Sequence, residues 1–336
     1  MDNLVKELTE AFGPSGEENE VRTLIKSLAK GKFDRVYEDV LGNLFLEREG
    51  SAPKILVSAH MDEIGVIVTH IDDNGFIRIA PVGGISVYGL PGKRFRFRNG
   101  TIGTVYHEKL DKISELEWNK TYLDIGQPDR ESAAKLVSIG DLACYDQSFR
   151  ALEGGRYISK AMDDRVGCAV LLEVLRRLPR KLPQAVCFLF SVQEEVGLRG
   201  ATTAAYRYEP DFGIAVDVTL VGDTPKAHLM EVSLGKGPAI KVKDRSVLCH
   251  PLVRKLMIDT AKVNNIPYQL EVLERGGTDA GAIHISREGV PSGAISIPCR
   301  YIHSPSEIVD SSDLKNAVLL LEKLLIDQWP TQERSY

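Results

Sequence analysis

Apolar residues recur at helical spacing near the start of the chain, over Leu4–Phe12 and again over Val21–Leu28. The turn Gly13–Gly16, which contains glycine and proline, separates the two runs. Ser15 and Glu18 have the spacing of a capping box, in which each side chain bonds the other residue's backbone N–H at the start of a helix. The pattern therefore predicts two amphipathic helices, with Ser15 and Glu18 at the beginning of the second.

Short apolar and β-branched runs further along the chain are typical of strands. Lys54–Ala59 has the length of a strand and few polar positions, as expected of a strand buried on both faces, and it leads directly into His60. The other predicted strands are Arg35–Tyr37, Leu44–Glu47, Val186–Phe190, Phe212–Val216, Lys241–Lys243, Tyr268–Val272 and Gly293–Ile297, and the later predicted helices are Val166–Leu178, Pro251–Asn264 and Ser311–Trp329.

The pattern changes between Val66 and Leu152, where strand-like segments alternate with Gly, Asn and Asp turns and no strong helical periodicity appears. The strands before this segment are too few to form a stable sheet alone. We therefore predict an α/β domain made of residues 1–65 and 153–336, with a central sheet flanked by helices, and a small β domain inserted at residues 66–152. Two consecutive domains are the alternative.

Composition narrows the class of protein. The 336 residues include 42 Lys and Arg against 47 Asp and Glu, and the net charge of −5 argues against a general nucleic-acid binder. A strand with one charged and one Phe face explains the basic run Lys93–Arg98. No apolar segment approaches the roughly 20 residues of a membrane span, so we expect no membrane partner. Five cysteines without a CxxC motif indicate reduced thiols and a cytoplasmic location.

Possible metal ligands follow several predicted strands. His60 comes directly after the strand 54–59. Glu194 and Glu195 follow the strand 186–190, and Asp217 follows the strand 212–216. His303 comes shortly after the last predicted strand, residues 293–297. Functional sites of open α/β sheets gather at the carboxyl ends of the strands, and a charge there is costly without a partner. The positions therefore suggest a shared cation.

Each of these motifs also has a plain structural interpretation. His60 with Asp62 has the form H-x-D, in which the carboxylate holds the second ring nitrogen of a metal-bound His, but a strand-end His bonded to backbone fits as well. Asp163 with Asp164 offers a carboxylate that bridges two cations, or the N-cap of the following helix. The Glu194-Glu195 pair offers one ligand and one free proton shuttle, or a solvated acidic turn.

Taken together, the positions offer two His, two Asp and one Glu as ligands, with a second Glu unligated. Oxygen and imidazole ligands without a thiolate suit Zn²⁺, Co²⁺ or Mn²⁺. Two such cations that share one carboxylate form a hydrolytic site.

The blocks AFGPSGEE, SAHMDEIG, AMDDRVG, VQEEVGLRGA, AVDVT, GGTDA and YIHSPSE occur in this order between residues 11 and 307. With these blocks the chain resembles the M42 family of co-catalytic metallo-aminopeptidases, which includes the self-compartmentalising tetrahedral peptidases. The resemblance implies an α/β metallopeptidase domain with a central mixed sheet, an inserted β-barrel-like dimerisation domain, and a homo-oligomer of twelve subunits built from dimers.

The resemblance also implies roles for individual residues. His60 and Asp217 would hold one metal, Glu195 and His303 the other, and Asp163 would bridge them. A cis peptide bond between Asp163 and Asp164 is also implied.

Glu194 would be the general base and then the general acid, and Asp62 would orient His60. The Gly loop that contains Gly277, Thr278 and Asp279 resembles the substrate-facing segment of the family; a plain turn is the alternative.

The predicted reaction is removal of the N-terminal residue from short peptides by a dinuclear metal-dependent aminopeptidase. A water activated by two Zn²⁺ or Co²⁺ ions would attack the first peptide carbonyl, with Glu194 as base. Two other functions stay open: a glycoside hydrolase, whose paired carboxylates leave His60 and His303 unexplained, and a non-enzymatic peptide-holding or assembly protein, which has no use for an unligated Glu194.

Overall fold

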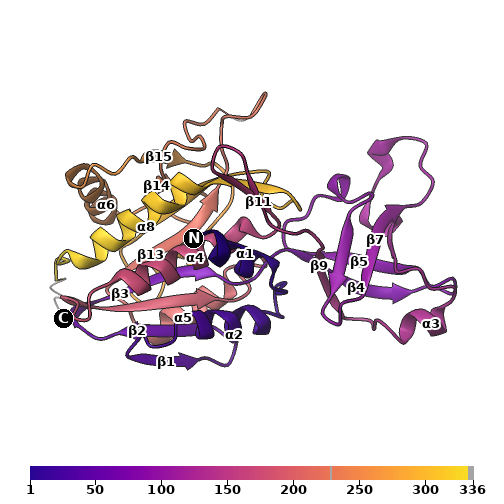
Figure 1. Ribbon diagram of the computed structural model, residues 1–336, viewed down its shortest axis with the longest axis horizontal. Helices are drawn as coiled ribbons and strands as arrows, with labels where there is room; N and C mark the ends of the chain where they lie inside the picture. The colour runs from indigo at the N-terminus through magenta and orange to yellow at the C-terminus, as the bar shows by residue number, and fades with distance from the viewer. Residues whose placement is uncertain (228, 332–336) are drawn as a thin grey trace.

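The computed structural model describes residues 1–227 and 229–331, and it shows a large body of helices and sheet beside a smaller β body (Figure 1). The chain enters the larger body first, passes through the smaller one, and returns to complete the larger one. The confirmed fold class is α/β with an inserted barrel. The boundaries at residues 66 and 152 stay a prediction.

The larger body is built on one mixed sheet of eleven strands within the described residues. The main path of the sheet follows the order β1-β2-β12-β3-β13-β16-β17-β11-β10, and β14 pairs with β16 and β15. The bounds are β1 (Arg35–Glu38), β2 (Leu44–Arg48), β3 (Ser51–His60), β10 (Arg150–Leu152), β11 (Arg156–Ser159), β12 (Gln184–Ser191), β13 (Phe212–Thr219), β14 (Ala239–Lys243), β15 (Gln269–Val272), β16 (Ser292–Arg300) and β17 (Glu307–Asp310).

Four adjacent strands at the centre of this sheet, β12, β3, β13 and β16, are parallel to one another. Strand β3 precedes the barrel in sequence and lies between two strands that follow it, which excludes two consecutive domains. Because parallel strands end at the same edge, residues that follow these strands meet there. Ser191 at the end of β12 pairs with His60 at the end of β3.

Helices cover both faces of the sheet. Successive strand side chains point to opposite faces: Val57 and Phe188 belong to the core under α1, α4 and α8, whereas Leu56 and Leu189 belong to the core under α5 and α7. The helices are α1 (Asp2–Glu10), α2 (Asn19–Leu28), α4 (Met162–Arg177), α5 (Arg199–Tyr208), α6 (Pro251–Val263), α7 (Asp279–His284) and α8 (Ser311–Ile326).

The smaller body is a closed antiparallel barrel with its own apolar core, which is separate from the core of the sheet. Phe95 and Phe97 point into this core, and the intervening Arg96 is less buried, as the alternating run predicts. The strands are β4 (Gly65–Ile71), β5 (Ile77–Val82), β6 (Arg94–Phe97), β7 (Ile102–His107), β8 (Thr121–Asp124) and β9 (Leu142–Tyr145), and the short helices are η1 (Val87–Gly89), η2 (Ile113–Glu115), η3 (Trp118–Lys120) and α3 (Arg130–Ala134).

The predicted capping box is wrong. Helix α2 begins at Asn19, its N-cap is Glu18, and no side chain caps it. The hydroxyl of Ser15 instead donates a hydrogen bond to Asp62, 47 residues away. Helices α5 and α7 were not predicted from the sequence. Among the described residues, no helix combines the length and apolarity needed to cross a membrane.

Candidate metal centre and active site

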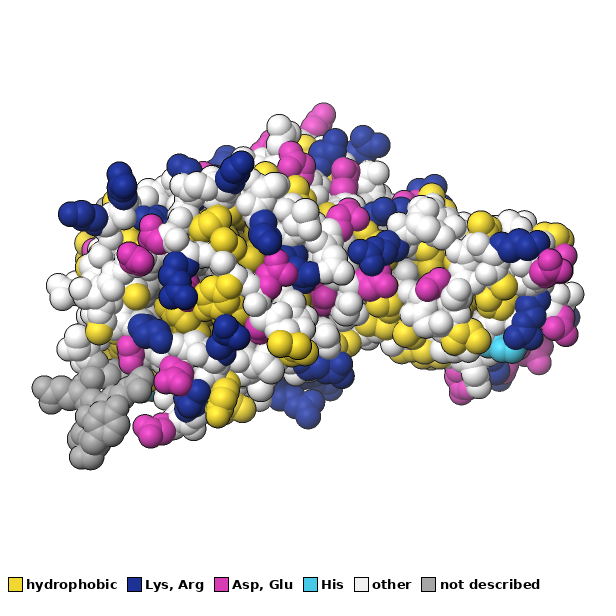
Figure 2. Space-filling view, turned by 90° about the horizontal axis from the view of Figure 1, so that it is seen from below, with side chains coloured by type: hydrophobic (Ala, Val, Ile, Leu, Met, Phe, Trp, Pro, Cys, Tyr) yellow, Lys and Arg dark blue, Asp and Glu magenta, His cyan; other side chains and the backbone are white. Residues whose placement is uncertain are grey.

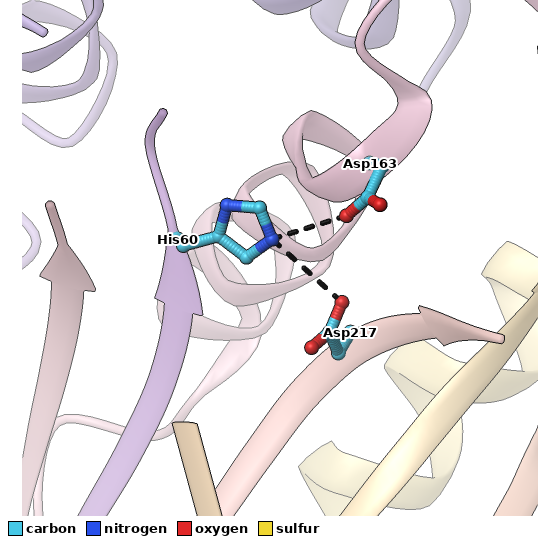
Figure 3. Close-up of side chains that lie close together, drawn as sticks. All are labelled: His60, Asp163 and Asp217. Carbon is cyan, nitrogen blue, oxygen red and sulfur yellow. Dashed lines mark hydrogen bonds and ion pairs between the residues drawn. The ribbon is translucent and has the colours of Figure 1, made fainter. Parts of the chain in front are cut away.

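Three predicted ligands from different elements meet at the carboxyl edge of the sheet. His60 ends β3, Asp217 lies near the end of β13, and Asp163 lies at the start of α4. The Nε2 atom of His60 lies 3.0 Å from Asp163 Oδ1 and 3.8 Å from Asp217 Oδ1, and all three side chains point to a common space (Figure 3). The three residues form a group that can hold a metal ion.

A second group of potential ligands contains Asp163, Glu195 and His303. The Nε2 atom of His303 lies 3.0 Å from Glu195 Oε2 and 3.3 Å from Asp163 Oδ2. Asp163 therefore belongs to both groups and turns one carboxylate oxygen to each. This arrangement allows a single carboxylate to bridge two cations.

The charge in this space fits cations. Burial, together with the nearby Asp163 carboxylate, raises the pKa of Asp217 to about 7. Burial and Asp163 also raise the pKa of Glu195, whose Oε1 atom is buried without a hydrogen-bond partner among the described residues. Carboxylates gathered away from water need a positive partner. The imidazole and carboxylate donors, with no thiol in either group, suit a borderline divalent metal.

The two adjacent aspartates at the start of α4 have different tasks. Asp163 faces the candidate ligands, and its peptide bond to Asp164 is cis, as the resemblance implies. The Asp164 carboxylate accepts hydrogen bonds from the N–H of Gly167, at 3.0 Å, and of His60, at 3.3 Å. One aspartate thus takes the ligand position, and the other bonds the first regular turn of the helix.

Asp62 organises the loop around the site. Its backbone oxygen lies 3.1 Å from His60 Nδ1, and its carboxylate Oδ1 lies 3.5 Å away. The same carboxylate accepts hydrogen bonds from the N–H groups of Glu194, at 2.9 Å, and Glu195, at 3.2 Å. Asp62 therefore connects the turn that carries the glutamates to the strand end that carries the histidine.

Glu194 belongs to neither ligand group, although its side chain reaches the same space. Its Oε2 atom lies 3.8 Å from His60 Nε2. Burial raises its pKa well above the usual range, and the carboxylates of Asp217 and Glu195 add to that effect. The structure thus brings a titratable side chain beside the candidate ligands without using it in either ligand group.

The site borders a cavity of about 440 Å³. Candidate ligands and Glu194 form one part of its wall, and apolar side chains form another: Leu198, Val218, Leu220, Leu273 and Ile302. Gly277, a predicted substrate contact, also lines it. Thr278 and Asp279 do not: both are buried, Asp279 begins α7, and its carboxylate accepts a hydrogen bond from Ser191. The loop therefore faces the cavity with the backbone of Gly277 and not with the side chains of Thr278 and Asp279.

Glu307 is a site residue that the sequence interpretation missed. Its carboxylate is buried and accepts hydrogen bonds from the N–H of Asp163, at 3.1 Å, and of His303, at 2.7 Å. Burial and the nearby Asp163 raise its pKa to about 8. Its place four residues after His303, in the block YIHSPSE, was the available signal.

The chain is similar to several known aminopeptidases. The family described as M42 glutamyl aminopeptidase matches residues 42–320. A putative aminopeptidase of Acetivibrio thermocellus is 54% identical over 96% of this chain and 97% of its own length. An aminopeptidase from the archaeon Desulfurococcus kamchatkensis has a TM-score of 0.93 at 40% identity, covering 97% and 94% of the two chains. The TET1 peptidase of Pyrococcus horikoshii, which can assemble into a tetrahedron or a large octahedral shell, has a TM-score of 0.87 at 33% identity, covering 97% and 99%. The chain therefore belongs to the M42 family of aminopeptidases.

Proposed function

We propose that this aminopeptidase uses two divalent metal ions, Zn²⁺ or Co²⁺, to remove the N-terminal residue from short peptides. His60 and Asp217 would hold one ion, Glu195 and His303 the other, and Asp163 both. The single observation that carries the proposal is the shared position of Asp163, whose two carboxylate oxygens face two different histidines.

The chemistry assigns separate work to the residues of the site. When bound, the two cations supply Lewis-acid activation of a water molecule and of the scissile carbonyl. Glu194 takes the proton of the attacking water and then donates it to the leaving amine. Asp62 positions His60 and the turn that carries Glu194. Gly277 contacts the substrate through its backbone, and the buried Thr278 and Asp279 support that loop.

The alternatives explain less of the site. Glycoside hydrolysis needs two carboxylates and gives no reason for His60 and His303 to face them. A peptide-holding protein gives no reason for Glu194 to lie in the cavity outside both ligand groups.

Assembly is a further part of the proposal: a homo-oligomer, a dodecamer built from dimers, with the barrel pairing subunits. The TET1 relative can assemble into a tetrahedron or a large octahedral shell. Figure 2 shows apolar side chains on the barrel near its junction with the larger body. Between β4 and β9 (residues 65–145), the exposed large apolar residues are Tyr88, Ile102, Tyr106, Ile113, Leu136 and Ile139. Exposed apolar surface of this kind marks contact sites.

A cytoplasmic location completes the proposal. All five cysteines are free and buried, and none pairs with another in a disulfide. Free thiols fit a reducing compartment.

The test is a panel of aminoacyl anilides assayed on purified protein before and after chelation, with Zn²⁺ or Co²⁺ added back and metal content measured. We expect activity to disappear with the metal and to return at two ions per subunit. Activity that survives complete metal removal would refute the proposal. Cleavage of a β-glucan instead of the aminoacyl anilides would also refute it.

A further inference from the structure

The loop between α1 and α2 lies against the candidate active site rather than serving as a helix cap. Two of its polar side chains are buried: Ser15 is 7% and Glu18 is 4% exposed. The loop is joined to the chain beyond β3 by backbone hydrogen bonds, from Ser15 N–H to Glu63 O at 3.2 Å and from Glu63 N–H to Gly13 O at 3.0 Å. The loop is therefore anchored next to Asp62.

Both side chains form hydrogen bonds that support the turn carrying the two glutamates, one through Asp62 and one directly. The Ser15 hydroxyl donates to Asp62 Oδ2 at 2.6 Å, the same oxygen that accepts from the N–H of Glu195. Glu18 Oε1 accepts from the N–H of Gln193 at 3.2 Å, and from the N–H of Gly16, in its own loop, at 2.7 Å. Three successive backbone N–H groups of one turn thus donate to two buried carboxylates, Glu18 and Asp62.

The backbone of this turn needs such support. Gln193 has a φ of +54°, in the left-handed region, which is strained for a residue with a side chain. Successive N–H groups in such a turn form a concavity that binds anions. Because the Glu194 side chain begins one residue later, the bonds that hold the turn also fix where its carboxylate can lie.

We propose that Ser15 and Glu18 are positioning residues for Glu194, acting through Asp62 and through the backbone of Gln193. The inference rests on the proposed function, in which Glu194 is the general base. It assigns a role in the reaction to the first loop of the chain, which supplies no candidate metal ligand. Displacement of a reacting group by about 1 Å can cost about a hundredfold in rate, so small shifts of the turn are sufficient.

The variants separate positioning from folding. Ser15→Ala removes the hydroxyl donor, and Ser15→Thr keeps it. Glu18→Ala removes the acceptor, and Glu18→Gln keeps a carbonyl oxygen for both N–H groups. The matched control is Ser27→Ala, because Ser27 is exposed on α2 and its hydroxyl bonds only Leu24 O among the described residues.

We expect Ser15→Ala and Glu18→Ala to lower kcat about 10- to 100-fold with little change in KM or bound metal. Ser15→Thr and Glu18→Gln should retain most of the wild-type kcat. Hydrogen exchange of the Gln193–Glu195 amides, measured on the metal-free protein as well, should rise about tenfold in the two alanine variants and stay unchanged in Ser27→Ala. Unchanged kcat and exchange, or a loss of kcat that merely follows loss of metal or of folded protein, would overturn the inference. An inactive wild-type enzyme with two bound metals would refute the proposed function instead, and the exchange data would still decide whether Ser15 and Glu18 hold the turn.

Discussion

The carbonyl oxygen of Gly84 lies 3.1 Å from Nδ1 of His303, although the two residues are 219 positions apart in the sequence. Gly84 follows β5, so the inserted segment contacts the candidate metal centre. With Nδ1 bonded to a carbonyl, Nε2 of His303 is the nitrogen left free toward Asp163 and Glu195. A Cβ atom on Gly84 would lie 2.6 Å from Nδ1, closer than the ring can accept without moving.

Gly84→Ala should therefore weaken metal binding at the His303 group. We expect roughly a 10- to 100-fold loss of affinity, the range seen when a partner of a metal-bound histidine is changed. Competition with a chromophoric chelator measures it. Gly89→Ala is the control, because a Cβ there meets no atom within 4 Å. Equal affinity in both variants would show that the Gly84 contact is incidental.

Glu194→Gln keeps the shape of the side chain and removes the base. We expect kcat to fall roughly 10²- to 10⁴-fold with both metals retained. Glu195→Gln should instead lose metal, because Glu195 lies 3.0 Å from His303 Nε2 in a ligand group. Steady-state kinetics with metal analysis checks both variants, and the opposite pattern would mean that the two roles are reversed.

Asp163 and His60 should differ in how much metal they hold. Asp163 belongs to both ligand groups, whereas His60 belongs to one. Asp163→Ala should lose both ions and His60→Ala mainly one, as measured by elemental analysis after gel filtration. Two tightly bound ions in Asp163→Ala would remove the bridge from the proposed mechanism.

The proposed assembly predicts a particle of about 12 × 37.1 kDa in light scattering. A closed particle should cleave short peptides from the N-terminus and spare folded proteins. Samples must be loaded with metal before the measurement, since loss of metal could itself dissociate the particle. A monomer with full activity, or equal cleavage of folded and short substrates, would contradict the proposed closed particle. A fully active dimer would refute the closed particle and leave the proposed chemistry unaffected.

A buried cluster of one lysine and two carboxylates, none of them in the two ligand groups, leads to a prediction about stability. Lys241, 2% exposed, lies 2.5 Å from Glu271 and 3.2 Å from Asp244. Lys241→Met leaves both carboxylates uncompensated, so the free energy of unfolding should fall by roughly 3–5 kcal/mol. Lys255→Met, which breaks an exposed pair with Asp259, should change it by less than about 0.5 kcal/mol. Denaturant titration compares the two, and equal losses would mean that burial gives the Lys241 pair no special importance.

Much of the architecture could be predicted from local pattern. Strand β3 was expected because Lys54–Ala59 is a short apolar run, and its direct passage into His60 made the histidine a candidate ligand. The approximate positions of α4 and α8 followed from helical periodicity, although α8 ends three residues before the predicted Trp329. On sequence grounds Asp163 could be a bridge between cations or a helix cap. In the structure it is Asp164 whose carboxylate accepts the hydrogen bond from the first regular turn of the helix.

Local pattern was less informative where a residue's partner is distant in the chain. Ser15 and Glu18 satisfied the spacing of a capping box, but Ser15 bonds Asp62 and Glu18 bonds Gln193. Helix α7 escaped prediction because its six residues are too few to show a helical period.

The sequence by itself determined the order of the elements, the type of most of them, and the set of imidazoles and carboxylates at the strand ends, because periodicity and adjacency are local properties of the chain. Only the tertiary structure decided which oxygen of Asp163 faces which histidine, that Gly84 contacts His303, and that Ser15 reaches Asp62. Those contacts depend on the parallel pairing of β12, β3 and β13 and on the return of the chain from the barrel, which bring distant residues to one edge of the sheet.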